Sequence, residues 1–504
     1  MKKQIIKNVQ STKYDVQRNN RTLEHLNNEV RIYTSLFSIR LFKCSLFILF
    51  LLPLGEGLSF AQYTKLLDFA GTSNGSNPHS SLISDGTFLY GMTSTGGTNN
   101  LGTIFKIKFD GTGFSKLLDF AGASNGAGPY DSFISDGTFL YGMTRAGGTN
   151  DIGTIFKIKP DGTGYSKLHD FGSGSDGFTP NGSLLSLGTF LYGMTSQGGT
   201  NGIGTIFKIK PDGSGYLKLL DFNNTNGSNP YGSFITDGTI LYGMTKGGGT
   251  NGLGTIFKIM PDGTGYTDLF DFSGTASGSN PRGSLVSDGT FFYGMTEQGG
   301  TGSIGVAFKI KTDGTGYLKL FDCAGLANGR YPAGSLVYDG TYIYGMAHEG
   351  GSNNLGLIYK IKTDGTGYYK LLDFAGASNG SYPYGSFISD GTFLYGMTDQ
   401  GGTNGKGTIF KIGLTSGIAE NNAAIDITVY PNPTNGKINV TSSQFENLKM
   451  QGIEIYNVMG ENVYSEKILN PKSLILNLDM PSGVYFLHLK TERGTATQKL
   501  IINK

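Results

Sequence analysis

The feature that most constrains this chain is a motif that returns at a nearly fixed interval. Leu89-Tyr-Gly-Met-Thr93 is followed about ten residues later by Gly102-Thr-Ile-Phe-Lys-Ile107. Copies of Tyr-Gly-Met start at Tyr90, Tyr141, Tyr192, Tyr242, Tyr293, Tyr344 and Tyr395, so the steps are 51, 51, 50, 51, 51 and 51 residues. Seven copies at this period predict a repeat architecture in which each unit is one supersecondary element.

Each unit is predicted to contain four short strands joined by tight turns. In the first complete unit the strands are Ser81–Ser84, Thr87–Thr93, Gly102–Lys108 and Phe114–Phe120. Asp-Gly pairs stand between the first and second strands and between the third and fourth, and they tolerate the positive φ that hairpins need. The 81 glycines of the chain fit many such turns. The unit is therefore predicted to be a four-stranded antiparallel meander.

The second strand is apolar on both of its faces. Phe88, Tyr90 and Met92 point one way, while Leu89 and Gly91 point the other. A sheet with one wet face would instead alternate apolar and polar residues. Both faces should therefore be covered, with Gly91 allowing a neighbouring sheet to approach closely. Repeated sheets of this size, packed on both sides, predict a β-propeller, and an open β-solenoid is the alternative.

The two ends of the repeat region complement each other. The region opens with a fourth strand, 63–69, that has no first three strands before it. It closes with a third strand, 407–412, that has no fourth after it. We therefore predict a seven-bladed propeller over residues 63–413, closed by the N-terminal strand beside three strands from 385–412. An unpaired edge would otherwise be exposed.

Long and short connections alternate within each unit. The connections 94–101 and 121–132 are long, whereas the Asp-Gly turns are short. In a meander, alternate connections lie at the same edge, so the long loops of all units are expected on one face of the disk. Loops on a rigid scaffold are where binding residues usually lie.

Residues 1–62 are predicted to be a polar leader followed by a secretory signal peptide. Arg40 and Lys43 precede an apolar run at 45–54 and a small-x-small end at 59–61. This arrangement is typical of a signal peptide, and the run is short for a membrane span, so a membrane anchor is the less favoured alternative. The long polar stretch before it suggests a start codon assigned too early.

Composition excludes several classes of function. The net charge of +2, with 15% charged residues, gives no basic face for nucleic acid. The cysteines are Cys44 and Cys323, and Cys44 falls in the segment expected to be removed, so no internal disulfide is expected. The histidines fall in different units, which predicts no metal site, and no cofactor is expected.

Two resemblances to known families cover most of the chain. The copies Gly-Ser-Phe-Ile-Ser-Asp-Gly-Thr-Phe-Leu-Tyr-Gly-Met-Thr and Gly-Gly-Thr-Asn-Gly-x-Gly-Thr-Ile-Phe-Lys-Ile resemble the GloVer tandem repeat of bacterial secreted proteins, over about 63–412. This resemblance implies a secreted repeat protein and brings no agreed activity with it.

Residues 425–504 resemble a type IX secretion C-terminal sorting domain of Bacteroidetes. The residues that carry this resemblance are Pro431, Asn432, Pro433, Gly436, Gly460, Gly483, Tyr485 and Lys499. It implies recognition by the type IX secretion machinery, removal of the domain, and a place outside the cell or on its outer surface. Short alternating strands predict a small Ig-like β-sandwich here, and 414–424 is interpreted as a linker.

Residues found in every unit are interpreted as structural. The Asp of Leu-Asp-Phe (Asp68, Asp119, Asp170, Asp221, Asp271, Asp322 and Asp373) is expected to cap the backbone where strand becomes loop. Asp-Gly-Thr-Gly is interpreted as a turn and not a calcium loop, which needs several oxygen ligands. Cys323 takes a position held by Phe elsewhere and is expected in the core, and His169 replaces a strand Leu.

Residues that differ between units are the candidates for binding. After the loop proline they are His79, Tyr130, Asn181, Tyr231, Arg282, Ala333 and Tyr384, and after the methionine they include Arg145, Lys246, Glu297, His348 and Asp399. The first set is expected to ring the mouth of the channel, where the tyrosines could stack on a sugar or peptide. Drift on solvated loops is the alternative explanation.

These observations predict a secreted or cell-surface, non-catalytic binding or display module, monomeric in its propeller. A carbohydrate-active enzyme is the first alternative, although Glu297 and Glu349 are the only glutamates of the propeller and a glycosidase needs a placed carboxylate pair. A purely structural surface-layer component is the second. The sequence does not identify the ligand.

Overall fold

The computed structural model describes residues 62–172, 174–414, 428–441, 450–457, 462–467, 474–491 and 494–504. Every element within these ranges is a β-strand. The described residues accordingly include no helix of the length and apolarity that a membrane crossing needs. The predicted leader and signal peptide, and the predicted linker from residue 415 onward, lie outside the described residues.

Residues 62–414, as far as they are described, form four-stranded antiparallel sheets, here numbered in sequence order. Sheets 1 to 3 consist of β2 (Ile83–Ser84), β3 (Phe88–Thr93), β4 (Thr103–Lys108), β5 (Ser115–Asp119); β6 (Ile134–Ser135), β7 (Leu140–Thr144), β8 (Thr154–Ile158), β9 (Ser166–Asp170); and β10 (Leu185–Leu187), β11 (Phe190–Thr195), β12 (Thr205–Ile209), β13 (Leu217–Asp221).

Sheets 4 to 6 repeat the same order. They consist of β14 (Ile235–Thr236), β15 (Leu241–Thr245), β16 (Thr255–Ile259), β17 (Thr267–Asp271); β18 (Val286–Ser287), β19 (Phe291–Thr296), β20 (Val306–Lys311), β21 (Leu318–Asp322); and β22 (Val337–Tyr338), β23 (Tyr342–Ala347), β24 (Leu357–Lys362), β25 (Tyr369–Asp373). In each of them the four strands are neighbours in sequence.

Sheet 7 combines the two ends of the repeat region. It contains β26 (Ile388–Ser389), β27 (Phe393–Thr398), β28 (Thr408–Gly413) and, at its outer edge, β1 (Tyr63–Asp68). Strand β1 runs antiparallel to β28, with Tyr63 opposite Ile412 and Asp68 opposite Thr408. The first strand therefore supplies the fourth strand of the last sheet.

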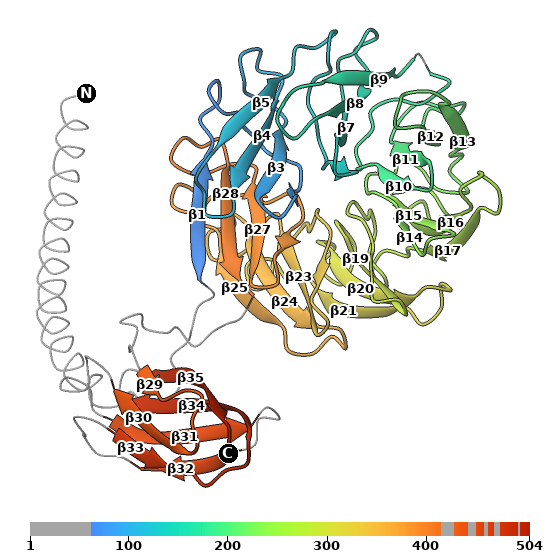
Figure 1. Ribbon diagram of the computed structural model, residues 1–504. Coiled ribbons are helices and arrows are strands. Elements are labelled where there is room, and N and C mark those ends of the chain that lie inside the picture. Colours follow the sequence, from blue (N-terminus) through green and yellow to red (C-terminus); the bar gives the residue numbers. More distant parts are fainter. Residues whose placement is uncertain are drawn as a thin grey trace, which may run out of the picture. The chain divides into compact units, whose positions relative to one another are not determined.

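The sheets are arranged as a β-propeller around a common centre, with the strands of sheets 1 to 6 running outward in sequence order and β1 outermost in sheet 7 (Figure 1). The core lies between neighbouring sheets. Tyr90 and Met92 of β3 pack with Leu140 of β7 and Phe156 of β8, whereas Leu89 packs on the other side with Tyr395 of β27. The two apolar faces of the second strand are thus both covered, as the sequence predicts.

Gly91 has a different role from the one its sequence position predicts. A β-carbon there would lie 2.6 Å from Cζ of Phe105 and 2.9 Å from Cδ2 of Leu82. Phe105 is the residue directly opposite Gly91 on β4. The glycine therefore makes room for an aromatic ring of its own sheet rather than for the approach of a neighbouring sheet.

The innermost strands are shorter than predicted, because β2 spans only Ile83–Ser84 and not Ser81–Ser84. The peptide of Ser81 instead bonds to the neighbouring sheet, donating its N–H to Oγ of Ser132 at 3.0 Å. The long loops also pair with each other: the backbones of Ser76 and Thr95 form an antiparallel bridge. This pairing places both long loops of a repeat at the same edge.

The C-terminal described residues form two sheets. One contains β29 (Thr428–Tyr430), β30 (Lys437–Thr441) and β33 (Leu474–Asn477); the other contains β31 (Met450–Asn457), β32 (Asn462–Glu466), β34 (Gly483–Thr491) and β35 (Gly494–Ile502). They share one core, in which Ile438 and Val440 of the first sheet pack with Ile455 and Leu487 of the second.

Candidate functional site

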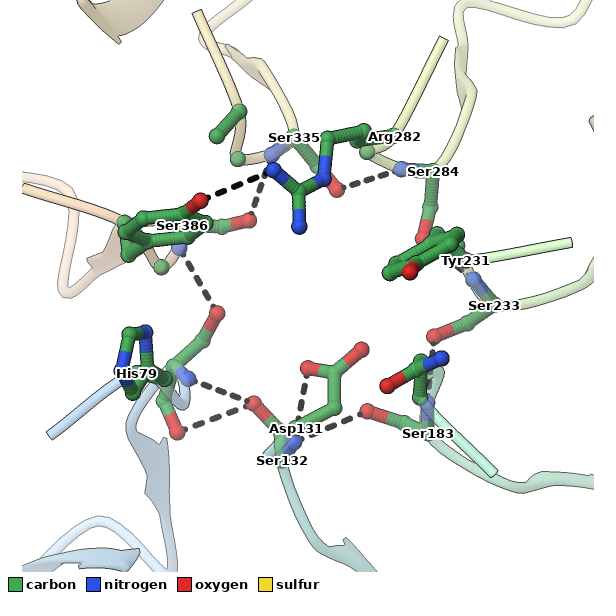
Figure 2. A pocket seen from close by; sticks show the side chains of 18 of the residues that line it. His79, Asp131, Ser132, Ser183, Tyr231, Ser233, Arg282, Ser284, Ser335 and Ser386 are labelled. Atoms are coloured by element: carbon green, nitrogen blue, oxygen red, sulfur yellow. Dashed lines mark hydrogen bonds between the residues drawn. The ribbon is translucent and has the colours of Figure 1, made fainter. Parts of the chain in front are cut away.

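A cavity of about 270 Å3 lies at the centre of the propeller, where each long loop enters an innermost strand (Figure 2). Every sheet contributes the same short segment, which ends in a serine. Those serines are Ser81, Ser132, Ser183, Ser233, Ser284, Ser335 and Ser386. Because the segment repeats, the cavity has a regular backbone frame on which only the side chains differ.

The serines form a closed ring of hydrogen bonds, in which the backbone N–H of each donates to Oγ of the serine in the next sheet. The donor–acceptor distances, starting from Ser81 and ending with the return from Ser386 to Ser81, are 3.0, 3.1, 2.7, 2.7, 2.8, 2.7 and 2.7 Å. The ring ties each sheet to its neighbour and leaves the hydroxyl groups beside the cavity.

The variable residues that follow the loop proline all line this cavity. His79, Tyr130, Asn181, Tyr231, Arg282, Ala333 and Tyr384 lie just before the serine ring. Arg145, Lys246, Glu297, His348 and Asp399 follow the second strands, and each of them contacts a residue of the first set. The structure therefore brings the two predicted sets together at one end of the channel.

Arg282 is the centre of a network that spans three sheets. Its Nη1 donates to Oε1 of Glu297 and to the hydroxyl of Tyr384, both at 2.8 Å. Nζ of Lys246 lies 3.3 Å from Oε2 of Glu297. Burial alone lowers the pKa of Arg282, but Tyr384 and Glu297 raise it above its ordinary value. The guanidinium therefore stays charged at the cavity wall.

His79 and His348 are neutral members of the site. Nε2 of His79 lies 3.2 Å from Oδ1 of Asp399. Burial lowers the pKa of His79, and this effect, together with the positive charge of Arg282, outweighs the opposite effect of Asp399. Burial likewise lowers the pKa of His348, whose ring meets Tyr384 edge-on at 4.7 Å. Both imidazoles are therefore uncharged at neutral pH.

The tyrosine rings at the mouth are already covered by other side chains. Tyr130 stacks on His79 with ring centroids 4.6 Å apart, and the guanidinium of Arg145 lies 5.3 Å from the same ring. Tyr231 lies 4.9 Å from the guanidinium of Arg282 and 5.2 Å from Nζ of Lys246. A ligand that stacked on these rings would have to displace such contacts. The polar edges of the cavity are therefore the more accessible recognition groups.

Asp131 lines the cavity too, although it is not among the residues predicted from the sequence. It precedes the ring serine, at the position of Gly182, Gly232, Gly283, Gly334 and Gly385 in sheets 3 to 7. Figure 2 shows its carboxylate directed into the cavity, where one oxygen accepts the N–H of Ser132 at 2.7 Å. The surrounding protein raises the pKa of Asp131 by desolvation. The signal in the sequence was a charged residue at a position that is otherwise small.

The residues common to all repeats have structural contacts. In sheet 1, Asp119 accepts the N–H and the hydroxyl of Thr98 at 3.2 and 2.8 Å and pairs with Lys116 at 2.8 Å. Asp110 accepts the N–H of Thr112 at 2.8 Å within its turn. Cys323 is buried in the core. Within the described residues, no three His, Cys, Asp or Glu side chains are grouped as a metal site would need.

The sorting-motif residues lie among the C-terminal strands. Asn432 accepts the N–H of Ile501 at 2.8 Å, between Pro431 and Pro433. Tyr485 donates its hydroxyl to the carbonyl of Pro481 at 2.9 Å. The remaining residues are Gly436, with a φ of 118°, Gly483 at the start of β34, and Lys499 within β35. Gly460 lies outside the described residues.

Similar solved structures show low sequence identity to this chain. An oligogalacturonate lyase in complex with manganese is 13% identical, with 70% of this chain and 93% of that chain covered and a TM-score of 0.49. A putative 6-phosphogluconolactonase from Bacteroides uniformis is 14% identical (77% and 99% covered, TM-score 0.43). The β-propeller domain of the Trilobed protease from Pyrococcus furiosus is 12% identical (70% and 95% covered, TM-score 0.42). No curated protein matches the sequence.

Two family profiles match the sequence itself. The Secretion system C-terminal sorting domain matches residues 428–503, and this domain indicates export followed by attachment to the cell surface or secretion. The Gloeobacter/Verrucomicrobia repeat matches residues 57–188, 131–291, 234–342 and 266–452. Together the repeat matches span more than half of the chain. The protein therefore belongs to the Gloeobacter/Verrucomicrobia repeat family.

Proposed function

We propose that this protein is a non-catalytic binding module, built as a closed seven-bladed propeller and displayed on the cell surface or secreted. Two observations support closure. Strand β1 pairs with β28, and the serine ring returns from Ser386 to Ser81 at 2.7 Å. Closure leaves only the short outer edges of the sheets unpaired and holds the channel mouth as a rigid frame. The C-terminal described strands act as an Ig-like sorting domain that engages the type IX secretion machinery.

The observation that carries the binding proposal is the contrast between frame and side chains at the mouth. The serine ring is the same in every sheet, whereas the residues just before it range from Ala333 to Arg282 and line one cavity. A scaffold requirement would repeat in every blade. A concave site with a few convergent polar groups is the usual form of a ligand site. We therefore assign binding to the mouth of the channel, with the propeller as a monomer.

The contacts of the two glutamates favour binding over glycosidase chemistry. Glu297 pairs with Arg282 and Lys246 at 2.8 and 3.3 Å. Glu349 pairs with Arg330 at 3.8 Å. Both carboxylates are thus already held by cationic side chains of the protein, which suits a positioning role better than that of a carboxylate pair placed on either side of a glycosidic bond.

Glycan and peptide arrays probed with the exported chain test this proposal. We expect wild-type protein to bind a defined subset of spots and Tyr231→Ala to lose that binding. Tyr338→Ala is the matched control, because Tyr338 is not among the residues that line the central cavity. Its ring stacks on that of Tyr293, with the centroids 5.9 Å apart. Equal binding by wild type, Tyr231→Ala and Tyr338→Ala would show that the binding site is not at the channel mouth. Turnover of a glycan that Glu297→Gln or Glu349→Gln abolishes would contradict the non-catalytic assignment.

A further inference from the structure

Asp131 stands where the architecture favours glycine. In sheets 3 to 7 a β-carbon at this position would lie 2.3–2.4 Å from the carbonyl oxygen of the next sheet. This is far inside van der Waals contact, so the equivalent glycines allow neighbouring backbones to touch. Sheet 2 nevertheless carries an aspartate there, and its carboxylate enters the cavity (Figure 2). In sheet 1 the residue is Ser80, whose hydroxyl donates to the carbonyl of Met92 at 3.0 Å, so Asp131 is the one residue at this position that brings a charge to the cavity.

The serine ring is wider on both sides of Asp131. The bonds from Ser81 to Ser132 and from Ser132 to Ser183 are 3.0 and 3.1 Å long, whereas the other five are 2.7–2.8 Å. The N–H of Ser132 is also shared with Asp131 Oδ1. The two longer bonds lie where Ser80 and Asp131 stand in place of glycine, so the added β-carbons account for the wider spacing. The feature that sets Asp131 apart is the charge that it brings to the cavity.

Arg282 faces the same cavity from the far side of the ring. It belongs to sheet 5 and Asp131 to sheet 2, which are three sheets apart, and Figure 2 shows the two side chains entering from opposite sides. Nη1 of Arg282 is engaged by Glu297 and Tyr384. A guanidinium has five N–H donors, and Figure 2 shows its other terminal nitrogen directed into the cavity with no bond drawn to it.

A ligand that carries only one charge does not match both sides of the cavity. A simple cation drawn to Asp131 would have to pass Arg145, Lys246 and Arg282 at the mouth, and a simple anion held by Arg282 would face the carboxylate of Asp131. A molecule with an ammonium group at one end and a carboxylate at the other satisfies both. Between them, the serine hydroxyls and Oδ1 of Asn181, which is 3% exposed and lacks a hydrogen-bond partner, can bond to amide groups.

Resting on the binding function proposed above, we propose that the cavity binds a short peptide by both termini, with its ammonium group on Asp131 and its carboxylate on Arg282. Capture of peptide termini by converging polar groups is a known recognition mode. An extended chain spans about 3.3–3.6 Å per residue, so a di- or tripeptide gives a terminus-to-terminus reach of about 7–10 Å by that spacing. The cavity volume of about 270 Å3 suits a molecule of that size.

Calorimetric titration of the exported chain with glycine, diglycine, triglycine and, as a carboxylate that lacks an ammonium group, glucuronate tests the proposal. We expect one length to bind best, and N-acetylation or C-terminal amidation of that peptide to weaken binding at least about tenfold, as loss of one partner of a buried charge pair does. Asp131→Gly, which restores the residue of sheets 3 to 7, should abolish the penalty of N-acetylation alone. Arg282→Gln should abolish the penalty of amidation alone, with Arg282→Lys intermediate and Tyr338→Ala unchanged.

Three outcomes would overturn the inference. They are equal binding of capped and free peptides, tighter binding of glucuronate than of any glycine peptide, and an unchanged N-acetylation penalty in Asp131→Gly. Should the arrays show binding that Tyr231→Ala removes while no glycine peptide binds, the peptide assignment fails and the binding function stands. Should neither assay detect a mouth-dependent ligand, both fail.

Discussion

The outer loops and the channel mouth use the same repeated backbone in opposite ways, and their carboxylates show the difference. Asp119, at the outer edge of sheet 1, accepts two hydrogen bonds from Thr98 and pairs with Lys116. Although burial opposes it, these contacts lower its pKa. Asp131, in the channel, has its pKa raised by burial. The same residue type is thus stabilised as a charge in one region and destabilised in the other.

This contrast separates what the scaffold needs from what a ligand would need. Residues that repeat in every sheet satisfy the backbone of their own sheet, so their environments favour the folded state. Asp131 is a residue that occurs once, at a position where a β-carbon would clash in sheets 3 to 7 and where sheet 1 has the small Ser80. Stability and function are therefore expected to respond to different substitutions, in the order given below.

The largest effect is expected from removing the closing strand. A chain that begins at Phe69 lacks β1 and leaves β28 of sheet 7 with an open edge. We expect a lower urea midpoint than any substitution below produces, together with self-association through the free edge. A chain that begins at Gln62 is the control. Identical midpoints for the two chains would mean that β1 contributes nothing to closure.

The next largest effect is expected at the glycine beneath the aromatic ring. A β-carbon at Gly193 would lie 2.4 Å from Cζ of Phe207. Gly193→Val should destabilise the protein by about 1–3 kcal/mol, the usual range for overpacking a core. Urea unfolding measures this, and Leu217→Ala, at a side chain that is 51% exposed, is the control and should change stability little. A neutral Gly193→Val would contradict the packing role of this glycine.

Much of this fold could be predicted from the sequence because seven copies of the unit show which features recur. Strand order, the partner of 63–68 and the capping role of Asp119 all follow from patterns that recur. The sequence did not predict that Gly91 accommodates Phe105 of its own sheet, because cross-strand neighbours depend on register. It also overestimated the innermost strand, since the alternation of residues 81–84 does not show that Ser81 bonds to the next sheet.

The candidate site was predictable in position but not in arrangement. The variable residues after the loop proline do line one cavity. Their mutual contacts could not be foreseen, because Arg282 reaches past Ala333 to the hydroxyl of Tyr384, 102 positions along the chain. Asp131 was not predicted, because the neighbouring position varies more strongly and carries five residue types in the seven units. A substitution of glycine by a charged residue was the informative departure.

A moderate effect is expected from removing one outer cap. Asp119→Ala leaves the N–H of Thr98 without its partner and removes the ion pair with Lys116. We expect a loss of about 1–2 kcal/mol, toward the low end for hydrogen bonds to a charged group because solvent screens this partly exposed site. Urea unfolding at pH 7 measures it. An equal loss in Lys246→Ala, at the channel mouth, would argue against a division between scaffold and site.

The smallest effect, and the one with a distinctive sign, is expected from Asp131→Asn as pH changes. The folded-state pKa of Asp131 is raised above its unfolded value of about 3.9. Between the two values the folded state binds more protons than the unfolded state, so this residue lowers stability as pH rises through that window. The Asn variant, which cannot ionise, should be as stable as wild type below about pH 4 and progressively more stable than wild type above that pH, by the same linkage.

Asp119→Asn should behave in the opposite way. A lowered pKa in the folded state stabilises the protein above the unfolded-state pKa, and this stability is lost as pH falls. Free energies of unfolding measured from pH 3 to pH 8 separate the two carboxylates. If both variants fell below wild type at neutral pH, Asp131 would belong with the structural caps, and its place in the cavity would no longer mark a binding residue.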